Sequence, residues 1–171
     1  MSEKDPSGPA PTPRQLAVGA TVFYLLMGLV GLGLIHVGNE DVYLVIFGGQ
    51  QHGLRDATLG CGAGLALVGL TWLLRGWRPL VEMKDLMAEA VGQPGTGVIA
   101  VLAITSAVGE ELLFRGGIQP LLGLPLTALA FGLMHGGLSS RFRTWVGFAI
   151  LAGFLLGGLY AYTDNLLAPI L

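Results

Sequence analysis

The spacing of charged residues along this 171-residue chain constrains its fold more than any other feature. Five runs contain no charged side chain, at residues 16–39, 57–74, 90–109, 116–140 and 144–163. An α-helix needs about 20 mostly apolar residues to cross a hydrocarbon core of about 30 Å, and each run is close to that length. Only 12% of the residues are charged, whereas a soluble domain has roughly 25%. The sequence therefore predicts an all-α fold, a polytopic transmembrane helical bundle.

The runs divide the chain into three regions. Residues 1–14 form a polar tail with four prolines, which we expect to be disordered because it has little apolar surface to bury. Residues 15–94 contain the N-terminal membrane helices and a connector. Residues 95–171 form a C-terminal core in which the remaining charged and polar residues of interest are found.

We expect about five spanning helices, at about 15–38, 57–75, 97–115, 118–138 and 144–163. Residues 42–47 are apolar but too short to cross a bilayer, which favours an interfacial or re-entrant segment. Residues 80–91 place apolar and charged side chains on opposite faces, which predicts an amphipathic surface helix. Residues 165–171 are typical of the first turns of a sixth helix, truncated where the sequence ends.

Composition also excludes several kinds of partner and cofactor site. A net charge of −2 leaves no basic surface for phosphate groups, so we expect no nucleic acid partner. The single cysteine, Cys61, cannot form an intrachain disulfide, and no Cys/His spacing indicates a structural zinc site. The expected partners are the membrane lipid bilayer and a membrane-associated peptide or protein substrate.

The distribution of lysine and arginine favours a cytoplasmic N-terminus in a multi-pass protein of the cell membrane. With that orientation, the outer side holds Arg55 and Arg115. The inner side holds the other seven basic residues: Lys4, Arg14, Arg75, Arg78, Lys84, Arg141 and Arg143.

Three charged residues stand out between positions 90 and 140: Glu110, Glu111 and Arg115. A charged group at membrane depth costs on the order of 2.5–3.5 kcal/mol. Glu111 and Arg115 are four residues apart, so a helix brings them together as a structural ion pair. Glu110 lies about 100° further around the helix and is suited to accept a proton from water. The alternative is that both glutamates lie among the headgroups and only mark a helix end.

His135 is the next polar group, within the apolar sequence AFGLMHGG. A lone membrane histidine often makes a hydrogen bond between helices, which is the alternative to a catalytic role. Phe131 lies one helical turn earlier, where its ring could orient the imidazole. The glycines around His135 reduce side-chain bulk and leave room for water or another helix.

The two motifs together, EExxxR at 110–115 and FxxxH at 131–135, resemble those of the CPBP intramembrane endopeptidases. This family comprises CAAX-processing and bacteriocin-processing (Abi) enzymes. The resemblance covers about residues 95–171. It implies hydrolysis of a peptide bond within the membrane, in a membrane-associated or lipid-anchored (CAAX-like) substrate.

The resemblance also implies roles for individual residues. Glu110 is the expected general base and His135 its partner in activating water, and Glu111 completes the catalytic motif while pairing with Arg115. Whether a metal takes part is open. Glu110, Glu111 and His135 are the side chains that could ligate a divalent ion such as zinc, although HExxH is absent.

The chain departs from the family pattern in lacking a third motif, HxxxN or HxxxD. No histidine follows His135, and Asn165 is the one late polar residue considered, with no geometric reason to assign it that role. A second hypothesis is therefore a non-catalytic membrane protein on the same scaffold, acting in bacteriocin self-immunity or partner binding. A proton-relaying transporter fragment is a third hypothesis, without a visible inverted repeat.

Overall fold

The computed structural model describes residues 12–38, 40–49, 52–91 and 94–171, and the regular structure of these residues is entirely helical. The elements are α1 (Pro13–Val37), α2 (Val42–Phe47), α3 (Gly53–Leu73), α4 (Arg78–Val91), α5 (Thr96–Glu111), η1 (Leu112–Ile118), α6 (Gln119–Met134), η2 (Ser140–Phe142), α7 (Arg143–Thr163) and α8 (Leu167–Ile170). The all-α prediction is confirmed.

Among the residues that the structure describes, four helical segments are long and apolar enough to cross a membrane: Arg14–Val37, Gly53–Leu73, Thr96–Met134 and Ser140–Thr163. Their outer faces carry large apolar side chains, such as Leu29, Leu65 and Leu151, which are 62%, 73% and 70% exposed. An apolar outer surface of this extent is unfavourable in water and matches a lipid environment. The prediction of a transmembrane bundle is confirmed.

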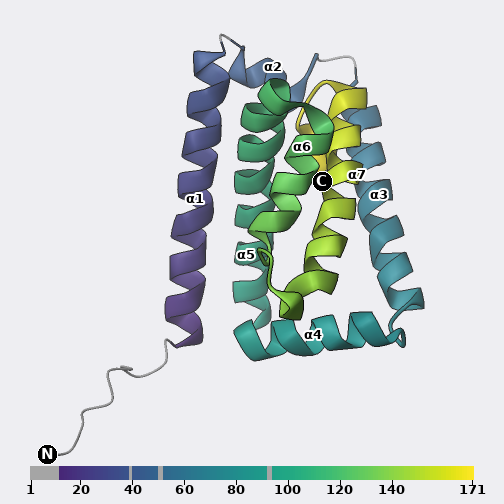
Figure 1. The fold of residues 1–171 in the computed structure, drawn as a ribbon. Helices are drawn as coiled ribbons and strands as arrows, with labels where there is room; N and C mark the ends of the chain where they lie inside the picture. Colours follow the sequence, from purple (N-terminus) through teal and green to yellow (C-terminus); the bar gives the residue numbers. More distant parts are fainter. Residues whose placement is uncertain (1–11, 39, 50–51, 92–93) are drawn as a thin grey trace, which may run out of the picture.

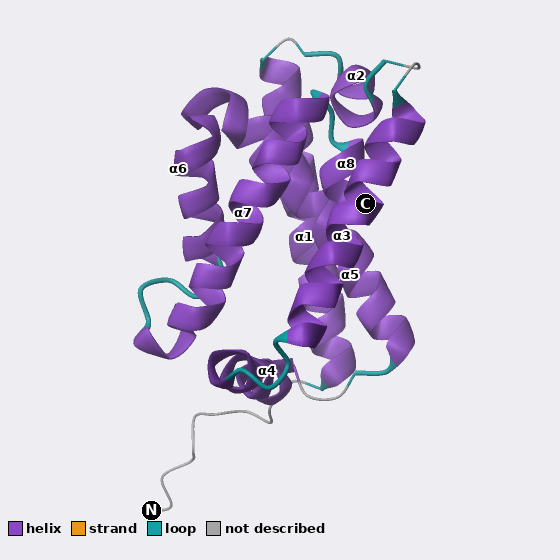
Figure 2. Cartoon of the chain, turned by 90° about the vertical axis from the view of Figure 1, so that its right-hand side faces the viewer, coloured by secondary structure: helices purple, strands orange, loops and turns teal. Residues whose placement is uncertain are grey.

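The long helices run roughly along one axis, and two shorter helices lie near its ends (Figure 1). Helix α4 crosses one end of the bundle, and Figure 2 shows it almost end-on. Its Met87 side chain faces the bundle interior, and its Glu89 forms an ion pair with Arg141 at 2.6 Å. The predicted amphipathic segment at 80–91 is thus a helix that covers the end of the bundle. Helix α2 lies near the opposite end and has only six residues.

The predicted boundary between the third and fourth membrane helices is wrong. We expected a break between residues 115 and 118, but the helical path continues from α5 through η1 into α6. The chain reverses at Gly123, which has φ 75° and ψ 164°. Glycine adopts this positive φ readily because it has no Cβ. Pro120 lies in the first turn of α6, where its missing N–H costs little.

The reversal at Gly123 makes the returning part of α6 short. Residues 124–134 span only about 16 Å at 1.5 Å per residue, and α6 ends at Met134 instead of the expected 138. His135 is the C-cap of this helix. In Figure 1, α6 ends before the level of α4. The short return of α6 therefore places the half-buried His135 before the level of α4.

Glycines allow close contact between the helices that carry the site. A Cβ on Gly109 of α5 would collide with the carbonyl oxygen of Tyr24 in α1. On α7, a Cβ on Gly153 would lie 3.1 Å from the Cα of Ala128 in α6. Close approach of this kind is typical of membrane helices with small residues at their interfaces. Helices α1 and α7 are consequently fixed against opposite sides of the α5–α6 segment.

Near both ends of the chain, the described helices lie close to where the sequence predicted them. Most of the predicted tail, residues 1–11, lies outside the described residues. Helix α1 begins at Pro13, two residues earlier than expected, because Thr12 and Gln15 form a capping box. The predicted first turns of a sixth helix correspond to α8.

Candidate active site

The EExxxR motif lies where α5 passes into η1, well inside the bundle. Glu111 is 2% exposed and Arg115 is 1% exposed, and Glu111 Oε1 lies 3.2 Å from Arg115 Nη1. Segment η1 is π-helical, a conformation that is rare in proteins and frequent at functional sites. Neither glutamate marks the end of the helical path, because the path continues through η1 into α6.

Arg115 also connects η1 to its neighbours. Its Nη2 donates to the carbonyl oxygen of Gly153 at 3.3 Å, and its guanidinium lies 4.5 Å from the centre of the Phe131 ring. One turn later, Gln119 Nε2 donates to the carbonyl oxygen of Gly157 at 2.9 Å. These contacts join the segment after Glu111 to α6 and α7.

Glu110 points in another direction, into a cavity of about 310 Å³. His135 lines the same cavity from the C-terminal end of α6, so the two predicted residues, both half-buried, share one pocket. Arg115, five residues later, supplies a positive charge that acts on the Glu110 carboxylate. No ion pair among the described residues includes Glu110. The structure thus separates the adjacent glutamates, one facing the cavity and one paired with arginine.

The imidazole of His135 is held by Phe131 and Trp145. Its Nδ1 lies 2.8 Å from the carbonyl oxygen of Phe131, and the two ring centres are 4.5 Å apart. Trp145 of α7 contacts the imidazole edge-on at 5.7 Å. A carbonyl oxygen only accepts hydrogen bonds, so Nδ1 is the nitrogen that carries the proton in the neutral imidazole, and Nε2 of that form can accept one. Phe131 therefore orients His135 through both its ring and its backbone.

Sequence reasoning missed the residues that complete the cavity from other helices. Tyr24 comes from the middle of α1, Met87 from α4 and Trp145 from α7. Tyr24 was detectable, since tyrosine in membrane helices is enriched at the interfaces and this one lies near the centre of a 25-residue helix. Nothing in the sequence indicated that Met87 would reach the site.

The proposed metal ligands do not converge. Glu111 is turned toward Arg115 and does not line the cavity that Glu110 and His135 share. Across the part of the chain that the structure describes, no three His, Cys, Asp or Glu side chains form a group that could hold a metal ion. The donor set that the sequence suggested for zinc therefore does not fit a metal centre.

Asn165 lies outside the candidate site. Its Nδ2 donates to Asp56 Oδ2 at 2.8 Å and to the carbonyl oxygen of Thr163 at 2.8 Å. Asp56 belongs to the first turn of α3, and both Asn165 and Asp56 are 1% exposed. This polar cluster connects α3 to the turn between α7 and α8.

The fold and this cavity define a helical membrane protein in which a carboxylate and an imidazole from two helices line one pocket. Residues 93–171 match the family model of the Rce1-like type II CAAX prenyl endopeptidases. This region contains both motifs, so the resemblance to the CPBP family is confirmed over residues 93–171.

A relative with a curated sequence supports the match. The chain is 35% identical over 71 residues to the uncharacterised protein YpbD of Bacillus subtilis (strain 168). The alignment covers 42% of this chain and 37% of YpbD, so the chain spans little more than a third of that relative. No solved structure matches the chain.

Proposed function

We propose that this protein is an intramembrane endopeptidase that hydrolyses peptide bonds in membrane-associated or lipid-anchored, CAAX-like substrates. The observation that supports this proposal best is the shared cavity of Glu110 and His135. The Rce1-like match over residues 93–171 supports the reaction class independently of that geometry.

The arrangement suits water activation by two groups. Glu110 accepts a proton from a water molecule while Nε2 of His135 accepts the second hydrogen bond of that water, and the water oxygen adds to the peptide carbonyl carbon. The tetrahedral intermediate then collapses, the C–N bond breaks, and the amine nitrogen takes the proton that Glu110 held. Phe131 keeps the free imidazole nitrogen available, and Glu111 neutralises the buried charge of Arg115.

The route of the substrate follows from the position of α4. Met87 of α4 lines the cavity, so the peptide enters beside this helix at the end of the bundle that α4 covers. With the cytoplasmic N-terminus indicated by the basic residues, this end faces the cytoplasm. The substrate then approaches from the inner leaflet of the cell membrane.

Cleavage by the purified chain in liposomes tests the proposal. A lipid-anchored reporter peptide should be cleaved by the unchanged chain, and Glu110→Gln should lower kcat by at least about 100-fold, the lower range for loss of a general base. His135→Ala should have a similar effect. Glu40→Gln is the matched control, because Glu40 is an exposed glutamate beyond the end of α1.

The outcomes separate the candidate functions. Full cleavage by Glu110→Gln or His135→Ala contradicts the assigned roles. If the unchanged chain binds the lipid-anchored peptide but leaves it intact, the non-catalytic scaffold hypothesis replaces the endopeptidase.

A further inference from the structure

Tyr24 is a cavity residue from a helix outside the region that matches the Rce1-like family. It lies in α1, whereas the family match begins at residue 93. It lines the cavity that contains Glu110 and His135. Its phenol is therefore a polar group that the two motifs do not account for.

The backbone fixes Tyr24 and Glu110 against each other. A Cβ on Gly109 would collide with the Tyr24 carbonyl oxygen, so α1 and α5 touch directly at the residue before Glu110. A Cβ on Gly28, one turn after Tyr24, would lie 3.6 Å from the Cα of Gly109. Because both contacts involve backbone atoms, neither helix can slide without separating the pair.

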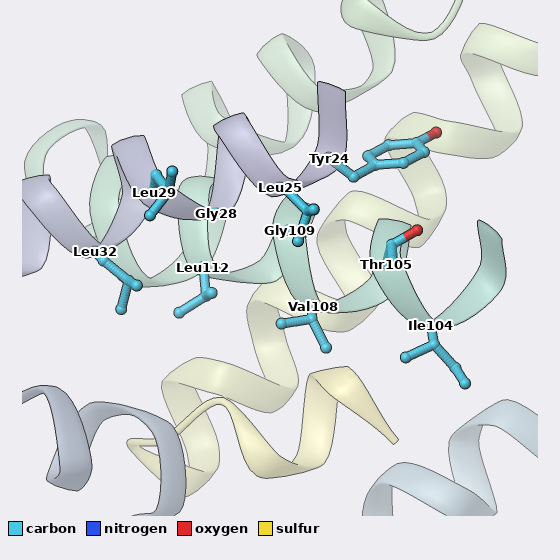
Figure 3. Close-up of a pocket in the computed structure, with 10 residues that line it drawn as sticks. All are labelled: Tyr24, Leu25, Gly28, Leu29, Leu32, Ile104, Thr105, Val108, Gly109 and Leu112. Atoms are coloured by element: carbon cyan, nitrogen blue, oxygen red, sulfur yellow. The ribbon is translucent and has the colours of Figure 1, made fainter. Parts of the chain in front are cut away.

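The ring of Tyr24 is also held in place. It packs against the buried core cluster formed by Met27, Phe114, Phe131 and Ala149, and it meets the Phe23 ring edge-on at 5.6 Å. Tyr24 further lines an apolar groove of about 490 Å³ between α1 and α5, and Figure 3 shows its ring extending away from the leucines of that groove. The aromatic part therefore contacts apolar atoms, and the residue lines both this groove and the cavity that holds Glu110.

Tyr24 and Glu110 line the same cavity, so the phenol and the carboxylate share one space. The neighbouring cation, Arg115, is paired with Glu111, and Glu110 takes part in none of the ion pairs among the described residues. A phenol has one proton to donate and a carboxylate has two oxygens that accept. A hydrogen bond from Tyr24 would hold one oxygen and leave the other for water.

We infer that Tyr24 is a positioning residue, whose phenol fixes one carboxylate oxygen of Glu110 so that the second oxygen faces the water in the cavity. The inference rests on the proposed function. It adds a residue of α1 to the site that the two motifs form. Its consequence is that α1 is part of the catalytic apparatus as well as a packing partner of α5.

Tyr24→Phe tests this inference, because it keeps the ring and removes the donor. The expected result in the liposome assay is a kcat lower by about 10- to 100-fold with unchanged KM, since misplacing a reacting group by about 1 Å can cost 10²-fold. The thermal unfolding temperature in detergent should stay the same. Tyr162→Phe is the matched control, because Tyr162 is 70% exposed on α7. An unchanged kcat for Tyr24→Phe, or a rise in KM alone, overturns the inference.

An isotope-edited infrared spectrum makes the inference testable even without activity. Glutamate labelled with carbon-13 gives a carboxylate band for Glu110, identified by its loss in Glu110→Gln. Tyr24→Phe should shift this band, and Tyr162→Phe should not. If the unchanged chain is inactive but the shift is present, the proposed function fails and the contact stands. If the band does not move, the inference fails whatever the activity.

Discussion

Two buried polar clusters among the described residues of this apolar bundle differ in how completely their atoms are paired. One consists of Glu111 and Arg115 next to Glu110, and the other of Asp56 and Asn165 between α3 and the start of α8. All four residues are at most 2% exposed. The burial is therefore equal, and the difference lies in the hydrogen bonds.

In the cluster between α3 and α8, the Asn165 and Asp56 side chains have hydrogen-bond partners. Both polar atoms of the Asn165 side chain are used, because Nδ2 donates to Asp56 and Thr163 and Oδ1 accepts from the Leu167 amide at 3.0 Å. Asp56 is also paired with Arg55, whose side chain reaches the surface. A satisfied buried network of this kind stabilises one arrangement of the helices.

In the cluster of Glu111 and Arg115, some side-chain atoms lack hydrogen-bond partners. Glu111 Oε2 and Arg115 Nε have no hydrogen-bond partner among the described residues. A buried polar atom without a partner costs about 1–3 kcal/mol, and such atoms in native proteins are associated with functional sites. The comparison indicates that the α3–α8 cluster serves the fold, whereas the Glu111–Arg115 pair lowers stability in return for a charged environment next to Glu110.

Arg115→Met should have the largest effect on stability. It leaves the Glu111 carboxylate buried and unpaired, and removing one partner of a buried ion pair costs about 3–5 kcal/mol. The free energy of unfolding in detergent micelles measures this loss. Peptide cleavage should fall as well, because the arginine no longer acts on Glu110.

The double variant Glu111→Leu with Arg115→Met is the control. Replacing both charges by apolar groups should recover most of the lost stability, since such replacements of buried pairs are often neutral or stabilising. Cleavage should stay well below that of the unchanged chain. A double variant that regains both stability and full activity would show that the pair serves only the fold.

The sequence predicted most of the fold, because in a membrane protein the runs without charged residues indicate where the spanning helices lie. The uncharged runs located α1, α3, α5 and α7 to within a few residues. The spacing of Glu111 and Arg115 predicted their ion pair, because i,i+4 contacts depend only on local geometry. Local rules were sufficient for these features.

The errors have a different origin. The reversal at Gly123 was placed too early because Arg115 was taken as a sign of the membrane surface, whereas the tertiary contacts of Arg115 with Gly153 and Phe131 allow it to be buried. Tyr24 and Met87 reach the cavity through helix packing that leaves no periodic signal. Contacts between segments distant in the sequence could not be derived from one chain without its structure.

Asp56→Leu should have a smaller effect on stability, of about 1–3 kcal/mol, and none on catalysis. It removes one acceptor of Asn165 Nδ2, and a lost partner of a buried polar group has a cost of this size. The free energy of unfolding should fall while kcat per folded molecule stays constant. A decrease in kcat at a temperature where the variant is fully folded would mean that the α3–α8 cluster also affects the site.

Glu89→Gln should have the smallest effect, because the ion pair between Glu89 and Arg141 is exposed to solvent. The two side chains are 68% and 57% exposed, and exposed pairs contribute about 0.2–1 kcal/mol. The pair nevertheless connects α4, whose Met87 lines the cavity, to the segment before α7. Unfolding and cleavage measured at low and high salt should show a small loss that disappears at high salt, where the pair is screened in the unchanged chain too. A loss of cleavage that persists at high salt would show that Glu89 acts on the site by something other than this surface charge pair.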